Sequence, residues 1–86
     1  MDINQLISII KDKIKKKIKY ENIKIEDKTF LHKKHQSHKE GKFHLKLTIE
    51  SKELKILNKI ESNKKIYRII DEELKKYIHS LQILIE

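Results

Sequence analysis

The apolar residues near the start of the chain recur at spacings of three and four. This spacing places them on one face of an amphipathic helix, which we expect over residues 2–19. Asp2 is a plausible cap for the start of this helix, and the lysines near its end suit the negative end of the helix dipole. The apolar face comprises Ile3, Leu6, Ile7, Ile10, Ile14 and Ile18.

Two later segments alternate between apolar and polar residues, and this alternation predicts half-buried strands. The first strand is expected over residues 20–26, where Ile23 and Ile25 face one side. The second is expected over residues 42–50. Its apolar side consists of Phe43, Leu45, Leu47 and Ile49, and its polar side of His44, Lys46, Thr48 and Glu50.

Residues 52–76 are helical in character, with apolar residues at Leu54, Leu57 and Ile60 and then at Ile66, Ile69, Ile70 and Leu74. Ser62 and Asn63 interrupt the apolar spacing, and either residue could cap a second helix. The chain then ends in IHSLQILI, which predicts a short apolar strand. We expect His79 to share one face of this strand with Leu81, Ile83 and Ile85.

The expected order is therefore helix, strand, strand, helix, helix, strand. Two alternating strands imply one covered and one open sheet face. We expect an α/β (α+β) fold, with the helices on a single face of a three-stranded sheet. No repeat or long linker divides the chain, so we expect one domain over residues 1–86.

The net charge of +8 favours contact with a polyanion such as nucleic acid. The obvious basic patch includes Lys13, Lys16 and Lys17 of the first helix, and Lys64 and Arg68 follow on a later helix. Lysine is far commoner than arginine, whereas a surface that reads base sequence favours arginine. The single glycine leaves no Gly-x-x-Gly clamp for a nucleic-acid backbone. A solvated lysine face on the helix is the alternative interpretation.

The chain contains no cysteine, so no disulfide and no thiolate ligand is available. It lacks the pattern of a signal peptide, and no run approaches the roughly 20 apolar residues of a membrane span. We therefore expect a soluble, cytoplasmic protein. No nucleophile–base pair, phosphate-binding glycine loop or HExxH motif is present, so we do not expect an enzyme.

Four of the five histidines lie in FLHKKHQSHKEGKFH, residues 30–44, which also holds the only glycine, Gly41, at an expected turn. The spacing of His32, His35 and His38 could bring three imidazoles together as a divalent metal site. Such a site would bind weakly, because it has no thiolate and lysines surround it. A solvated loop is the alternative.

Several short motifs follow one another in an order that is informative as a whole. An acid-x-Thr-x-x-His-x-x-His pattern is formed by Asp27, Thr29, His32 and His35. HLKLTIES from His44, IYRIIDEEL around Tyr67 and IHSLQI around His79 come after it. From about Ile25 to the C-terminus, the chain resembles the BolA family in these motifs and their spacing. The resemblance implies a class II KH-like fold, which agrees with the expected order of elements.

The resemblance also implies a partner and a cofactor. BolA-like proteins pair with a monothiol glutaredoxin and share a [2Fe–2S] cluster, to which the glutaredoxin and a glutathione supply sulfur. Such a module would serve iron–sulfur trafficking or iron sensing. Some family members are described as DNA-binding transcriptional regulators, which is the alternative function.

The residues that match the family's ligand positions are histidines. The resemblance implies that His79, at the Ile-His start of the last strand, is one cluster ligand. It also implies a second ligand from the loop between the first two strands, with His32 as the first choice and His35 as the alternative. Without the resemblance, His79 would be interpreted as a half-buried histidine at a strand end. We expect His44 to be structural.

Two positions depart from the family pattern. The usual Arg-His-Arg between the helices is replaced by Ser62-Asn63-Lys64, which removes two of three possible cations and one histidine. A usual glycine just before the helix pair is replaced by Ile56. The first change weakens the expectation of DNA contact through that motif, and the second suggests a local change where the helices begin.

Overall fold

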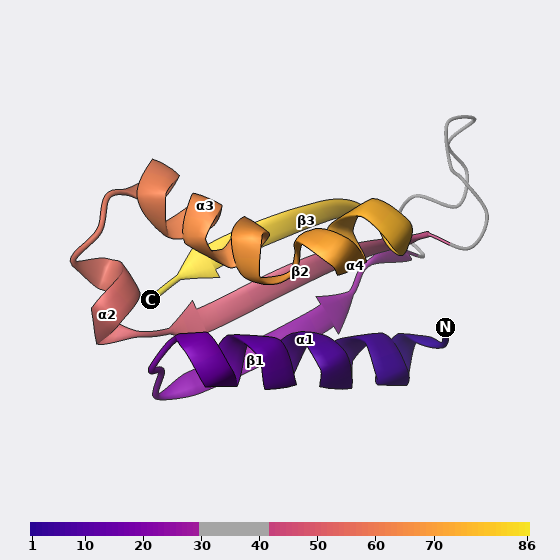
Figure 1. The fold of residues 1–86 in the computed structure, drawn as a ribbon, viewed down its shortest axis with the longest axis horizontal. Helices are drawn as coiled ribbons and strands as arrows, with labels where there is room; N and C mark the ends of the chain where they lie inside the picture. The colour runs from indigo at the N-terminus through magenta and orange to yellow at the C-terminus, as the bar shows by residue number, and fades with distance from the viewer. Residues whose placement is uncertain (30–41) are drawn as a thin grey trace.

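The computed structural model describes residues 1–29 and 42–86 of the chain. The elements follow the expected order, except that the helical region between the last two strands contains three segments instead of two. In chain order they are α1 (Ile3–Lys17), β1 (Asn22–Asp27), β2 (Phe43–Glu50), α2 (Lys52–Lys55), α3 (Lys59–Ile69), α4 (Asp71–Lys76) and β3 (Ile78–Ile85), as Figure 1 shows. None of the helices in these two ranges is long and apolar enough to cross a membrane.

The three strands form one sheet in the order β1-β2-β3. β1 and β2 are antiparallel, whereas β2 and β3 are parallel and need a long connection between them, which α2, α3 and α4 provide. α1 contacts α3, and α4 contacts β3, so the helices form one layer against the sheet (Figure 1). The expected α/β fold is confirmed.

The core lies between the helical layer and the sheet. Ile10 of α1 is almost completely buried, as are Leu47 and Ile49 of β2. Ile23 and Ile25 of β1 are partly buried against the same cluster. The apolar face of the first helix therefore meets the apolar side of both alternating strands, as the spacing predicted.

The start of α1 is fixed by Asp2, which is confirmed as its cap. The Asp2 carboxylate accepts a hydrogen bond from the backbone N–H of Gln5 at 2.9 Å, and the Gln5 side-chain oxygen accepts one from the Asp2 backbone N–H at 3.3 Å. This reciprocal pair satisfies backbone donors that a helix start leaves without partners. The last turn of α1 is basic, as its dipole favours.

The expected cap at Ser62 or Asn63 is wrong. Asn58 caps α3 instead, because its side chain accepts a hydrogen bond from the backbone N–H of Glu61 at 2.8 Å. Ser62 lies buried inside the helix, where its hydroxyl donates to the Lys59 carbonyl at 3.1 Å. A serine whose hydroxyl bonds within the preceding turn does not have to end a helix.

The orientation of α3 also differs from the expected one at its first turn. Ser62 and Ile66, four residues apart, define the buried face of α3. Ile60 lies two residues before Ser62, on the opposite side of the helix, and is 68% exposed. Its expected place on the apolar face is therefore wrong. Ile70, with φ −110° and ψ 26°, ends α3 and separates it from α4.

The last strand occupies the expected residues, but its first residues pair irregularly. Phe43 of β2 pairs with Ile78, whereas the next residue, His44, pairs with Ser80. The register shift leaves His79 as an extra residue on β3. An extra residue of this kind bends a strand and redirects a side chain.

The shift overturns the expected orientation of His79. From Ser80 onward, exposed and half-buried residues alternate, and Leu81 is half-buried. His79 does not share that face, because it is exposed and its ring lies beside the ring of His44.

Candidate functional site

His44 and His79 form a pair at the end of the sheet where β2 and β3 begin. Their ring centroids lie 4.8 Å apart, and the ring planes are inclined by 49°. His44 is only 5% exposed, whereas His79 is exposed. The pair therefore has one ring held within the protein and one ring available to a partner.

Ser80 holds the buried ring in place. The Nδ1 atom of His44 lies 2.6 Å from the Ser80 hydroxyl oxygen, within hydrogen-bonding distance. Because Ser80 directly follows His79, this contact also fixes the strand segment that carries His79. His44 thus has a structural role of the kind expected. Its burial beside His79 was not foreseen, because strand alternation placed it on the open side of the sheet.

Asp27 and Thr29 connect the end of β1 to the same place. Both the backbone N–H and the hydroxyl of Thr29 donate to the Asp27 carboxylate, the N–H at 2.9 Å. The Thr29 hydroxyl oxygen accepts a hydrogen bond from the backbone N–H of His44 at 3.1 Å, and the Lys28 N–H donates to the His44 carbonyl at 2.7 Å. The acid-x-Thr motif therefore joins β1 to the residue that packs against His79.

The expected loop histidines lie outside the described residues; they are His32, His35 and His38. The same holds for the turn expected at Gly41. The segment that contains them leaves the described structure after Thr29 and returns before Phe43. The Thr29 hydroxyl oxygen accepts a hydrogen bond from the His44 backbone N–H, and the Phe43 N–H donates to the Tyr77 carbonyl at 2.9 Å. The described residues on either side of this segment, Thr29 and Phe43, are thus held at the end of the sheet that carries His79.

The described residues do not form a metal site by themselves. Within residues 1–29 and 42–86, no three His, Cys, Asp or Glu side chains gather closely enough to hold a metal ion. His79 is an exposed imidazole on a strand, and a neutral imidazole nitrogen is a suitable ligand for iron, zinc or copper. Among the described residues, His79 is therefore an exposed imidazole that is not part of a ready metal site.

Four of the five residues expected to contact nucleic acid come together in space. They line one pocket between α1 and α3, and we call them the basic cluster: Lys13, Lys16, Lys17 and Arg68. Ile69 forms the apolar part of the same pocket. Lys64 is exposed on α3 and does not line this pocket. The packing of α1 against α3 thus adds the chain's only arginine to the lysines of the first helix.

Acidic residues of α4 partly neutralise the basic cluster. The Lys13 Nζ donates to Glu73 Oε2 at 2.6 Å and lies 3.6 Å from Glu72 Oε2. The hydrogen bond to Glu73 raises the pKa of Lys13 above its usual 10.5. The Glu73 side chain is only 6% exposed, so it needs this positive charge beside it.

The other three members of the basic cluster are not neutralised by acidic side chains in this way. Within the described part of the chain, no ion pair involves Lys16, Lys17 or Arg68. These three side chains are exposed. They therefore carry the positive charge that is available to a polyanion.

Comparison with known proteins identifies the family. The sequence pattern of BolA-like proteins matches residues 14–86. The chain belongs to the BolA family. The matched part of the chain includes the paired histidines, three of the four residues of the basic cluster (Lys16, Lys17 and Arg68) and the histidine-rich segment between β1 and β2.

Individual relatives agree with this assignment. A curated BolA protein, the DNA-binding transcriptional regulator BolA of Haemophilus influenzae, is 32% identical over 75 residues, which cover 87% of this chain and 70% of the relative. Among solved structures, BolA1 from Arabidopsis thaliana has a TM-score of 0.76 at 25% identity and covers 93% of this chain and 88% of its own. The BolA domain of SufE1 from Arabidopsis thaliana has a TM-score of 0.77 at 22% identity, covers 100% of this chain and 93% of its own, and shows the same fold.

Proposed function

We propose that this BolA-family chain is an interaction module that pairs with a monothiol glutaredoxin and co-ligates a [2Fe–2S] cluster, for iron–sulfur trafficking or iron sensing. The observation that carries the proposal is the position of His79. It is exposed, it lies at an irregular strand start, and it is backed by the buried ring of His44. A ligand held in this way loses little side-chain freedom when it binds.

The donor set of the chain suits a shared cluster. The chain has no cysteine and so provides no sulfur ligand of its own. Histidine can replace cysteine on one iron of a [2Fe–2S] cluster and raises its reduction potential. In the proposed complex, His79 supplies nitrogen, and the glutaredoxin and a glutathione supply sulfur. This role requires no catalytic step by the chain.

The proposed second ligand comes from the segment between β1 and β2. His32 is the first choice and His35 the alternative, and both belong to the segment whose flanking residues, Thr29 and Phe43, lie at the end of the sheet that carries His79. The network of Asp27, Thr29 and His44 supports this proposal, because it holds one end of that segment against the strand that packs on His79.

Reconstitution of the complex tests the proposal. The chain is mixed with a monothiol glutaredoxin that carries its cluster and glutathione, and the visible absorption and circular dichroism are followed. We expect a heterodimer whose spectrum differs from that of the glutaredoxin homodimer, because nitrogen replaces sulfur on iron. A spectrum that remains that of the homodimer at every mixing ratio would contradict the proposal.

The alternative function is DNA binding through the basic surface. The specific observation in its favour is the basic cluster. Three of its four cationic side chains are exposed and make no ion pair with any described residue. The name of the Haemophilus influenzae relative points the same way. Lysine and arginine on a helix surface suit phosphate contacts, which give affinity without reading sequence. Binding of this kind is expected to be similar for unrelated sequences and to weaken steeply with salt.

A further inference from the structure

β3 is an edge strand without charge. It lies at one end of the strand order, and within the described ranges no other strand lies on its outer side. No residue from Ile78 to Ile85 is charged, although 40% of the chain is Asp, Glu, Lys or Arg. Edge strands usually carry charges or other devices that prevent pairing with a further strand. The uncharged edge of β3 is therefore chemically suited to pair with a further strand.

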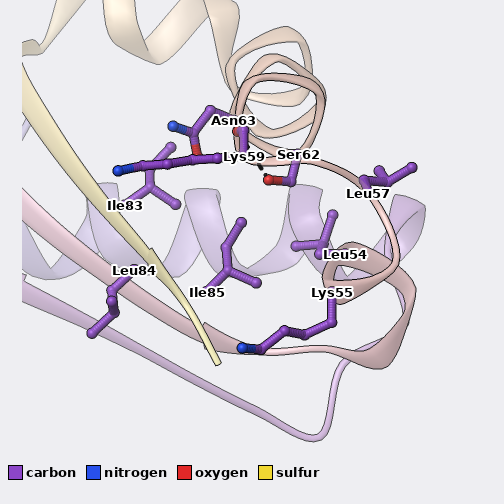
Figure 2. A pocket seen from close by; sticks show the side chains of 9 residues that line it. All are labelled: Leu54, Lys55, Leu57, Lys59, Ser62, Asn63, Ile83, Leu84 and Ile85. Atoms are coloured by element: carbon purple, nitrogen blue, oxygen red, sulfur yellow. Dashed lines mark hydrogen bonds between the residues drawn. The ribbon is translucent and has the colours of Figure 1, made fainter.

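An apolar pocket adjoins the C-terminal half of this edge. Figure 2 shows Ile83 and Ile85 pointing from β3 toward the side of α3, while Leu84 points away. The apolar lining residues are Leu54, Leu57, Ile83, Leu84 and Ile85. Leu84 is 45% exposed, and Ile56, in the connection between α2 and α3, is 85% exposed. Leu84 thus exposes an aliphatic side chain on the unshared edge strand.

The charged residues that line this pocket are both lysines. Lys55 and Lys59 are exposed lining residues, and in Figure 2 both side chains extend from the helices toward β3. The other polar lining residues, Ser62 and Asn63, are uncharged, and no acidic residue lines the pocket. Lys59 also occupies the first turn of α3, where a positive charge is unfavourable for the helix itself. Its side chain makes no ion pair with a described residue, so its charge is available to a ligand.

We propose that β3 and this pocket bind an extended acidic segment of a partner protein, which adds to the outer edge of β3 as a fourth strand. Backbone hydrogen bonds to β3 provide affinity, alternate apolar side chains enter the pocket, and carboxylates of the segment contact Lys55 and Lys59. A second copy of this chain fits less well, because its net charge of +8 would meet two more lysines.

A single-stranded nucleic acid is the competing occupant. Such ligands bind by stacking bases on aromatic side chains and by contacts to the phosphates. The lining residues of this pocket are aliphatic or polar, and none is aromatic. The chemistry of the pocket therefore favours a peptide.

The proposed strand site is separate from the proposed cluster ligand. His79 lies at the start of β3 and Leu84 near its end. At about 3.3 Å per strand residue, these positions are roughly 17 Å apart. A variant that loses peptide binding at the strand site can therefore be distinguished from a variant that loses the cluster ligand His79.

The test uses a fluorescent peptide of alternating valine and glutamate, as long as β3, and three comparison probes. These are the same peptide with alternate backbone N-methyl groups, a peptide with lysine in place of glutamate, and a labelled oligothymidylate. We expect the acidic peptide to bind and to shift backbone amide resonances at residues 81–85. N-methylation and charge reversal should each weaken binding by about tenfold or more, because they remove strand pairing and charge complementarity.

Charge-reversing variants locate the site on the protein. Lys55→Glu/Lys59→Glu should weaken acidic-peptide binding by about tenfold, while Lys15→Glu/Lys24→Glu, with the same change in net charge, should change it by less than about threefold. The His79→Ala variant should bind the peptide as the parent does. Equal loss in both double variants, equal binding of the N-methylated peptide, or displacement of the peptide by oligothymidylate from residues 81–85 would overturn the proposal.

Discussion

The rings of His44 and His79 meet because β3 carries one more residue than β2 at their shared end. Phe43 pairs with Ile78 and His44 with Ser80, so His79 lies between two paired positions, with its ring centroid 4.8 Å from that of His44. An imidazole at such an irregularity is exposed and yet supported by a buried neighbour. This arrangement leaves the His79 ring accessible to a partner, as the proposed function requires.

Ser80 is expected to control this arrangement. Ser80→Ala removes the hydroxyl 2.6 Å from His44 Nδ1. Loss of a hydrogen-bond partner for a buried group typically costs about 1–3 kcal/mol, so the free energy of unfolding should fall by that order. The imidazole resonances of His79 should shift as well. Gln82→Ala, at an exposed position of the same strand, is the control, and a Ser80→Ala variant indistinguishable from it would refute this role.

Ile10 tests the packing of α1 on the sheet. It is 1% exposed in the core that α1 shares with β2. Ile10→Ala should reduce the free energy of unfolding in urea by about 2–5 kcal/mol, the usual loss for a large buried aliphatic side chain. Ser8→Ala, at an exposed position of the same helix, should have a much smaller effect. A loss for Ile10→Ala below about 0.5 kcal/mol would be incompatible with a buried residue.

Glu53 provides a prediction about pH. Its carboxylate accepts a hydrogen bond from Lys65 Nζ at 2.9 Å, and this bond lowers the pKa of Glu53 below its usual 4.5. The folded state therefore binds a proton on the Glu53 carboxylate less tightly than the unfolded state does. The stabilisation that the Glu53–Lys65 ion pair gives to the folded state is present above about pH 4.5 and is lost as the pH falls through the folded-state pKa of Glu53.

Glu53→Gln should therefore be less stable than the parent near neutral pH, and the difference should shrink as the pH falls below about 4.5. Urea unfolding as a function of pH measures this difference. Glu50→Gln is the control, because it makes the same charge change at a residue that has no ion pair to another described residue. If the Glu53→Gln difference stays constant down to pH 3, the ion pair with Lys65 does not contribute to stability.

Much of this fold could be predicted from the sequence, because the strongest patterns come from burial on one side. The alternation in residues 42–50 placed Leu47 and Ile49 correctly in the core, and the last strand was predicted at its observed residues. Asp2 was correctly interpreted as a cap, since its side chain acts within one helical turn. Each of these features depends on local spacing.

The features that could not be predicted depend on contacts between distant segments. Ser62 and Asn63 resemble a helix cap, but Ser62 finds a hydrogen-bond partner inside α3 and is buried there. His44 alternates onto the polar side of β2 and is nevertheless buried, because the register of a parallel neighbour brings Ser80 and His79 against it. Arg68 joins the lysines of α1 only through helix packing.

The basic cluster leads to a prediction about salt. If DNA binds there through phosphate contacts, Lys16→Gln/Lys17→Gln should weaken binding to unrelated sequences alike. It should also reduce the slope of log affinity against log salt by about two, at roughly 0.9 per lost contact. Fluorescence anisotropy at several salt concentrations measures both quantities.

Lys24→Gln/Lys46→Gln, on the sheet, makes the same charge change and is the matched control for the basic cluster. The slope of log affinity against log salt for this variant should stay close to that of the parent. Equal slopes for the two double variants would show that the basic cluster is not the contact site. Tight binding that selects one sequence at physiological salt would instead require base contacts that this cluster does not provide.

The most direct test of the proposed function is the cluster spectrum of His79→Ala mixed with cluster-loaded monothiol glutaredoxin and glutathione. His79 is exposed, so the variant should unfold at the same urea concentration as the parent. We expect His79→Ala to abolish the mixed-ligand spectrum, His32→Ala to weaken it with partial replacement by His35, and the control His38→Ala to leave it unchanged. An unaltered mixed-ligand spectrum in folded His79→Ala would contradict the assignment of His79 as a ligand.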